Sequence, residues 1–169
     1  NKNIPIILKL TDNKIINQTV PKEDDYLEKL LFGKDAEDFY INRIEKQDQL
    51  LVSIARKDTI DEIIKRYEDA GCSIIDFSIG TFSLEYLKDF MAPNDKIITK
   101  HYSYNFTTGK IDKKDMLDRK LPNLEIHGEM IKNSHLIAFS SFLSYLNPAL
   151  LLRNYEAKLL DKQKEYTFS

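Results

Sequence analysis

The chain has 169 residues, of which 42% are hydrophobic and 31% charged, a composition typical of a folded globular protein with one domain or two small subdomains. Its 25 basic and 27 acidic residues give a net charge of −2 and are mixed along the chain, so we expect no binding to nucleic acid. The longest apolar runs, among them Ile4 to Leu8 and Ala149 to Leu152, are far shorter than the roughly 20 residues that cross a membrane.

The first part of the chain reads as two strands and a helix. Ile4 to Leu10 and Lys14 to Val20 are rich in β-branched residues, and the polar residues between them predict a hairpin. A proline ends the second run. Acidic residues that can cap a helix follow, and we expect this helix to end at Leu31 and to be closed by Gly33.

Local signals agree best between Phe39 and Gly80. Asp38 to Ile44 and Leu50 to Arg56 flank a polar turn and predict a second hairpin, whose second strand is covered on both faces. The helix from Lys57 to Ala70 is expected to begin on Asp58 as its cap. Its apolar stripe consists of Ile60, Ile63, Ile64 and Tyr67.

A strand from Cys72 to Ile79 follows this helix. We expect its face with Ile75, Phe77 and Ile79 to be apolar and the other face to be more polar. Because a strand, a helix and a strand are joined by short turns, the pattern predicts a right-handed crossover with the helix packed on the sheet.

The second half of the chain predicts a mixture of helices and short strands. Thr81 or Ser83 can cap a helix that reaches Met91. Strands over Lys96 to Phe106 and Lys110 to Leu117 then flank a Thr-Thr-Gly turn, which is a strong hairpin signal.

Beyond this hairpin we expect one more strand and two helices. The strand covers Leu124 to His127, and the first helix begins at Asn133 or Ser134 and ends at Leu146. Its core-facing stripe consists of Leu136, Phe139, Leu143 and Leu146. Pro148 begins the last helix, whose second half is highly charged.

Residues that could carry catalysis are few. His127 and Glu129 form an H-x-E motif, but zinc deaminases also need a downstream P-C-x-x-C, which this chain lacks. Metal ligation by residues around this turn, including His135, is disfavoured against a structural role. Cys72 is the only cysteine, which excludes an internal disulfide and fits a reducing compartment. At the start of a strand it is expected to be buried and inert.

The sequence offers no phosphate-binding loop. Phosphate loops need glycines so that backbone N–H groups can approach the anion. Each of the five glycines already serves a turn or a helix end, and neither G-x-x-x-x-G-K-[ST] nor G-x-G-x-x-G occurs. We therefore expect no bound cofactor, no metal and no catalytic residue.

Two surface features could serve as docking sites. Arg56 and Lys57 lie where a strand turns into a helix and could contact an acidic partner, although solvated charge is the more common reason for such a pair. Tyr102, Tyr104 and Phe106 alternate along one strand, a pattern that favours the core of a sheet over an exposed docking row.

The order of elements from Ile4 to Leu87 resembles the actin-like assembly-platform proteins of type IV pili and type II secretion, PilM and the cytoplasmic part of GspL. In that family a segment of the type V-x-A-R-K/R-x-x-h-D, where h is apolar, opens a helix that ends at a glycine and returns through a strand to the main subdomain. The matching segments are Val52 to Asp61 (VSIARKDTID), Gly71, Ile74 to Ile79, and Gly80 to Leu84.

The resemblance implies an α/β (α+β) fold, a partial actin-like (ribonuclease H-like) scaffold with an inserted ferredoxin-like subdomain. Residues 1–20 and 81–147 would form the actin-like core, 21–80 the insert, and 148–169 a charged helix that leads toward a membrane anchor outside the chain. The absence of an initiating methionine and the charged end fit a piece of a longer protein.

The departures from the family concern its nucleotide site. Nucleotide-binding members carry a D-x-G-x-[ST] turn after the Leu84 helix, whereas Lys96 to Phe106 has neither glycine nor D-x-G. The resemblance thus implies a degenerate, non-enzymatic scaffold in the cytoplasm at the inner membrane. Its partners would be other assembly-platform proteins, such as secretion or pilus subunits and the assembly ATPase, with a homodimer as a further possibility.

Two other functions stay open at this stage. The chain could be a fragment of an ATP-binding ATPase of the same fold whose phosphate loops lie outside it. It could also be a sensor or regulatory module that binds a small ligand in an apolar pocket ringed by polar groups.

Overall fold

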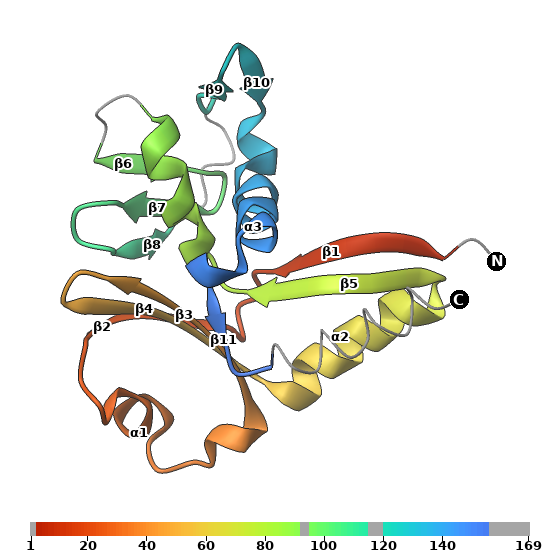
Figure 1. The fold of residues 1–169 in the computed structure, drawn as a ribbon, viewed down its shortest axis with the longest axis vertical. Coiled ribbons are helices and arrows are strands. Elements are labelled where there is room, and N and C mark those ends of the chain that lie inside the picture. The colour runs from red at the N-terminus through yellow and green to blue at the C-terminus, as the bar shows by residue number, and fades with distance from the viewer. Residues whose placement is uncertain (1–2, 92–94, 115–119, 156–169) are drawn as a thin grey trace.

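The computed structural model describes residues 3–91, 95–114 and 120–155. The chain forms a mixed α/β structure of the α+β type, in which several small sheets are joined by short helices (Figure 1). No helix within the described ranges is long and apolar enough to cross a membrane.

A four-stranded antiparallel sheet in the order β11-β3-β4-β2 organises the middle of the molecule. The predicted second hairpin is confirmed, with β3 over Phe39–Lys46 paired along its whole length to β4 over Gln49–Arg56. The expectation that its second strand is covered on both faces is also confirmed, because Leu50, Leu51 and Val52 are all at most 2% exposed. The edge strands are β2 (Ile16–Pro21) and β11 (Leu152–Arg153).

The predicted hairpin at the start of the chain is wrong. Strand β1 (Ile4–Leu10) pairs in parallel with β5 (Cys72–Ile79), and β2 pairs with β4. The segment between β1 and β2 makes its own turn, in which the Ile15 N–H donates to Asp12 O, and the Ile15 side chain is buried in the core. The chain therefore passes from one sheet to the other at this turn and does not fold back on β1.

Helix α2 (Lys57–Asp69) confirms the most regular prediction of the sequence and packs against β5, as Figure 1 shows. Its cap is Arg56, so the expected cap on Asp58 is wrong; that carboxylate accepts from the next N–H, Thr59. Strand β4 belongs to the four-stranded sheet, whereas β5 pairs with β1. The crossover through α2 therefore connects two different sheets. The core cluster that α2 shares with the strands consists of Leu8, Leu10, Ile15, Tyr40, Ala55, Ile60, Ile64, Ile74, Phe77, Ile79 and Tyr155.

The polar face expected for β5 is buried. Ser73, Asp76 and Ser78 are all at most 6% exposed. Helix α2 covers one side of the strand, and polar groups from other elements meet the other side. Strand β5 is therefore buried on both faces, although apolar and polar residues alternate in its sequence.

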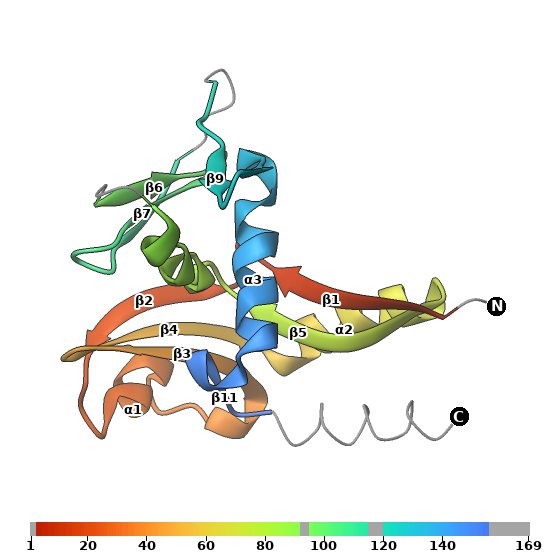
Figure 2. The ribbon, with the colours of Figure 1, turned by 45° about the horizontal axis from the view of Figure 1, so that its top comes forward.

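The four-stranded sheet is covered on both of its faces. Helix α1 (Tyr26–Leu31), which confirms the first predicted helix, and the short η1 (Ala36–Asp38) cover one face. The other face carries η2 (Phe82–Phe90), a 3₁₀ helix where an α-helix was expected, and the sheet β6-β7-β8. Figures 1 and 2 show α1 and the small sheet on opposite sides.

The single strand expected over Lys96 to Phe106 is wrong. It is divided into β6 (Lys96–Ile98) and β7 (Tyr102–Asn105) by a turn in which Thr99 Oγ1 accepts from the Tyr102 N–H at 3.2 Å. The hairpin from β7 to β8 (Ile111–Lys113) is confirmed. The core placement of Tyr104 and Phe106 is confirmed as well, at 0% and 2% exposure.

The C-terminal part contains β9 (Leu124–Ile126), as predicted, and β10 (Glu129–Ile131), which was not. The predicted helix follows as η3 (Asn133–His135) and α3 (Leu136–Leu146). The helix expected from Pro148 is wrong over its first part, which forms η4 (Pro148–Leu150) and then β11. Its charged second half lies outside the described residues.

A glycine at the end of β5 lets three elements approach closely. Gly80 has φ +80°, and its N–H donates to Leu10 O at 2.8 Å. Asn17 Oδ1 accepts from the Thr81 N–H at 3.1 Å and from Ser53 Oγ at 2.8 Å. A Cβ at Gly80 would overlap both Ser53 and Asn17.

Replacing this glycine tests the close approach. Gly80→Ala should lower the free energy of unfolding by about 2–4 kcal/mol, because it combines a left-handed backbone with a side-chain clash. Gly33→Ala is the matched control, since Gly33 has φ +76° and open space around it. It should cost about 1 kcal/mol. Urea denaturation measures both, and equal losses would contradict the clash.

Candidate functional site

A buried ion pair joins the last described strand to β5. Arg153 of β11 pairs with Asp76, and their side chains are 4% and 5% exposed. Arg153 Nη1 also donates to Phe77 O at 3.1 Å. Removing one partner of such a pair leaves an uncompensated buried charge, at a cost of about 3–5 kcal/mol. The pair therefore fixes where the end of the described chain lies.

Lys9 of β1 brings a second cation to this pair. Burial, followed by repulsion from Arg153, lowers the pKa of its ammonium group to about 7, although Asp76 acts in the opposite direction. Lys9 Nζ donates to Ser78 Oγ at 3.3 Å and to Ile79 O at 3.4 Å. Two cations and one carboxylate are charge-balanced only when the lysine is neutral.

Further hydrogen bonds complete the buried polar cluster. Ser78 Oγ and Ser141 Oγ of α3 are 2.8 Å apart. Asn42 of β3 donates to Tyr155 Oη at 2.7 Å and accepts from the Ile79 N–H at 2.7 Å. The Tyr155 ring stacks on Phe77 with centroids 4.5 Å apart, and burial raises the pKa of the Tyr155 phenol. Thus residues of β1, β3, β5 and α3 meet Arg153 and Tyr155 in one polar layer.

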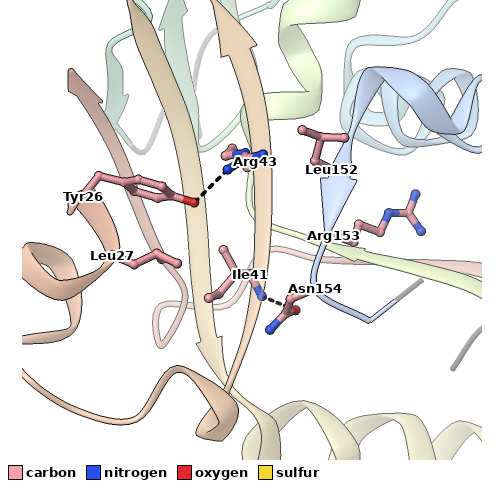
Figure 3. A pocket seen from close by; sticks show the side chains of 7 residues that line it. All are labelled: Tyr26, Leu27, Ile41, Arg43, Leu152, Arg153 and Asn154. Atoms are coloured by element: carbon pink, nitrogen blue, oxygen red, sulfur yellow. Dashed lines mark hydrogen bonds between the residues drawn. The ribbon is translucent and has the colours of Figure 1, made fainter. Parts of the chain in front are cut away.

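A pocket lies on the outer side of this layer, between α1 and β11 and above β3 (Figure 3). Its volume is about 230 Å³. The lining residues are Tyr26, Leu27, Ile41, Arg43, Leu152, Arg153 and Asn154. Figure 3 shows the Arg153 guanidinium turned away from the pocket, toward β5, while Arg43 lies beside Tyr26.

Of the two arginines that line the pocket, Arg43 is the one whose guanidinium is not turned toward β5. Its guanidinium lies 6.0 Å from the centre of the Tyr26 ring, and Nη1 donates to the Tyr26 hydroxyl at 3.3 Å. Nη2 is 3.7 Å from a carboxylate oxygen of Glu45. The buried Nε has no hydrogen-bond partner among the residues that the structure describes. Some N–H donors of the Arg43 side chain are therefore not used in hydrogen bonds within the described residues.

The Asn154 side chain forms the end wall of the pocket and makes hydrogen bonds to β3 that a neighbouring strand would otherwise make. Its side-chain Oδ1 accepts from the Ile41 N–H at 3.0 Å, and its Nδ2 donates to Phe39 O at 2.7 Å. The amide thus occupies backbone groups of β3 that the two-residue strand β11 does not reach. The hydrogen bonds to β3 therefore hold Asn154 in position as the end wall.

Helix α3 turns three serines inward and exposes two of its large apolar side chains. Ser140, Ser141 and Ser144 are at most 2% exposed, and Ser140 Oγ lies 2.8 Å from Ser83 Oγ of η2. Phe142 is 42% exposed and Leu146 is 62% exposed. The helix contains no charged residue from Leu136 to Leu146. A surface helix normally shows the reverse arrangement.

The expected core stripe of α3 is therefore only partly right. Leu136 is buried, Phe139 and Leu143 are half-buried, and Leu146 faces outward. The inward positions are taken by serines because α3 crosses close to η2 and β1, as in Figure 2. The three serines and the lack of charge were visible in the sequence and could have indicated this face.

The residues predicted for docking lie elsewhere. Arg56 sits at the end of β4, 3.5 Å from Asp58 and 5.9 Å from the centre of the Phe39 ring. Lys57 Nζ lies 5.6 Å from the centre of the Tyr40 ring. Neither lines the pocket or belongs to α3, and their role in docking stays a prediction.

The residues considered for catalysis are spread over the fold. His127 has φ +51° in the turn between β9 and β10, and His135 ends η3. Cys72 is half-buried at the start of β5. Within residues 3–91, 95–114 and 120–155, no three His, Cys, Asp or Glu side chains are grouped so that they could hold a metal ion. Arg43, Asn154 and Arg153 were missed because only the tertiary fold brings them together.

Comparison with known proteins identifies the fold. No family model and no curated protein sequence matches the chain. The structure is similar to the cytoplasmic domain of EpsL, an inner membrane component of the type II secretion system of Vibrio cholerae. The TM-score is 0.50 at 10% sequence identity, over 83% of this chain and 75% of that chain. The resemblance suggested by the sequence is confirmed at the level of the fold.

The lowered pKa of Lys9 makes the free energy of unfolding depend on pH. An unfolded lysine has a pKa near 10.4, so between about pH 7 and pH 10 the unfolded state holds more protons than the folded state. The free energy of unfolding should therefore rise with pH across this window. Below pH 7 the full cost of burying the ammonium group is present.

Lys9→Met should remove this cost. We expect it to raise the free energy of unfolding by on the order of 2 kcal/mol at pH 6, with a gain that shrinks toward pH 10. Urea denaturation at several pH values measures the gain. The control is Lys65→Met, which alters an exposed lysine of α2 and should have little effect at any pH. A gain that is independent of pH would contradict the assignment.

Proposed function

We propose that this chain serves as a non-catalytic scaffold in the assembly platform of a type II secretion or type IV pilus system. It would act in the cytoplasm at the inner membrane, by docking other platform proteins. The fold likeness to an inner membrane component of such a system supports this role. Contact with the membrane would be made through segments outside this chain.

The outward face of α3 is the observation that carries the docking role. Phe142 and Leu146 of α3 expose 42% and 62% of their surface, and Leu150 of the following η4 exposes 38%. The Phe142 and Tyr145 rings lie side by side, with centroids 6.4 Å apart. Burying a side chain of this size is worth about 1.5–3 kcal/mol. Exposed apolar side chains one helical turn apart, such as Phe142 and Leu146, are typical of protein interfaces.

The finer architecture is part of the proposal. Residues 1–20 and 81–147 would form an actin-like core, residues 21–80 a ferredoxin-like insert, and residues 148–169 the connection toward an anchor. The hairpin β3–β4, helix α2 and strand β5 follow in the order expected of the insert. The fold likeness spans both proposed parts, since it covers 83% of the chain.

A binding measurement with α3 variants tests the docking role. The double variant Phe142→Gln/Leu146→Gln should weaken binding to a purified assembly ATPase of such a secretion or pilus system by about 10–100-fold, because two apolar contacts are lost. Titration calorimetry with the purified proteins provides the dissociation constants. Circular dichroism checks that α3 is still folded.

The matched control removes an exposed aromatic residue on another surface. Phe32 at the end of α1 is 90% exposed and has φ +51°, a conformation that asparagine tolerates. Phe32→Asn should leave the affinity unchanged. Full affinity of the α3 double variant, with its helix content intact, would contradict docking through α3.

The non-catalytic part of the proposal has its own test. We expect calorimetric titration of the full-length protein with ATP and Mg²⁺ to give no saturable binding, because the sequence of this chain lacks glycine-rich phosphate loops. Tight binding would favour the ATPase alternative and would contradict the scaffold role. An established ATPase of the assembly platform, measured alongside, is the positive control.

A second function, that of a small-ligand sensor, is favoured by one observation. The pocket above β3 combines apolar walls with a cation and an amide. Its volume of about 230 Å³ is below the roughly 300–1,000 Å³ of most small-molecule sites. We therefore rank the sensor role behind docking.

A further inference from the structure

We propose that the pocket between α1 and β11 receives an acidic side chain of a partner protein, carried on an extended segment next to an aliphatic residue. This inference rests on the proposed docking function and adds a second contact of defined chemistry. It concerns a different surface from the outward face of α3. Three observations support it. No carboxylate among the described residues of the pocket neutralises Arg43, the walls beside Arg43 are apolar, and β11 lies at the edge of the sheet.

The charge of Arg43 is not neutralised within the pocket. Its nearest carboxylate, on Glu45, is 3.7 Å from Nη2 and accepts a hydrogen bond from Lys22 Nζ at 2.6 Å. The pKa of Glu45 is lowered chiefly by this hydrogen bond with Lys22, with Arg43 the weaker influence. The other cation that lines the pocket, Arg153, is bound to Asp76. Arg43 is thus left as the cation that a ligand would meet.

The donors of Arg43 match a carboxylate. A guanidinium has five N–H donors in a rigid fork that fits a carboxylate in two parallel hydrogen bonds. Among the described residues, Arg43 has one hydrogen bond, from Nη1 to the Tyr26 hydroxyl at 3.3 Å, and its side chain is 33% exposed, so Nη donors are left for a ligand. The Tyr26 hydroxyl and ring, whose centre lies 6.0 Å from the guanidinium carbon, hold the guanidinium in place.

The walls of the pocket select an aliphatic neighbour. Ile41 forms the floor, and Leu27 and Leu152 stand on the two sides, from α1 and β11. Leu152 is 37% exposed, so its apolar surface is available to a ligand. A carboxylate bound to Arg43 would place an adjacent aliphatic side chain against these three residues.

The sheet edge favours a protein segment over a free metabolite. Strand β11 is the first strand in the order β11-β3-β4-β2, and the structure places no further strand beyond it within the described ranges. An extended segment could therefore lie along β11 while its side chains enter the pocket, as in strand addition to a sheet edge. A small acid would use the pocket alone.

Short peptides test this assignment. The probe is the acetylated peptide amide GLELG, and its analogue GLQLG lacks only the charge. In ¹H–¹⁵N spectra of the full chain, GLELG should shift the Arg43 Nε–H resonance along a saturable curve, with a dissociation constant of about 1 mM. We expect GLQLG to bind at least about tenfold more weakly, since the charge-assisted pair is lost.

Variants and a free acid separate the outcomes. Arg43→Gln should abolish the binding measured on the Ile41 and Leu152 amides, and Arg43→Lys should weaken it. Arg56→Gln, which removes an exposed arginine outside the pocket, should leave it unchanged. Equal binding of the two peptides, or its loss in Arg56→Gln, would overturn the carboxylate assignment.

The source of the carboxylate is decided in the same experiment. N-acetyl-leucine carries a carboxylate beside an aliphatic group but cannot extend along β11, so it should bind more weakly than GLELG. Equally tight binding of the free acid would overturn the protein-segment assignment and favour a sensor. If no probe binds, the pocket proposal fails while docking through α3 is unaffected, because that is measured on another surface.

Discussion

The arrangement of this protein depends on the buried pair between Arg153 and Asp76. Strand β11 has only two residues and could not hold its place by backbone hydrogen bonds alone. The ion pair ties it to β5, 77 positions earlier in the sequence. Once β11 is fixed, Asn154 pairs with β3 and Leu152 forms a wall of the pocket. The chain from α3 to β11 then has a defined position.

The polar layer around the pair also shows why α3 presents an apolar surface. Ser141 reaches Ser78 beside Lys9, and Ser140 reaches Ser83, so the inward side of the helix is occupied by small polar groups. The helix consequently packs closely on η2 and β1, and two of its larger side chains, Phe142 and Leu146, point away. Buried polar groups cost free energy. We take their role here to be specificity, since they fix one helix position and so determine which side chains face a partner.

The sequence predicted the elements that depend on local signals. The hairpin β3–β4, helix α2 and the β7–β8 turn follow from patterns within about 20 residues, and all three are present. Pairings between distant segments were not predictable. The parallel β1–β5 ladder and strand β11 depend on contacts across most of the chain. The pocket residues Arg43 and Asn154 were missed for this reason, because each looks ordinary in its own segment.

A double-mutant cycle on the ion pair tests the central claim most directly. Asp76→Asn and Arg153→Met are compared singly and together by urea denaturation, with the α3 and pocket surfaces monitored by NMR. The account predicts that each single variant loses about 3–5 kcal/mol and that the double variant loses little more, a coupling of at least about 2 kcal/mol. Additive losses with β11 still in place would contradict it.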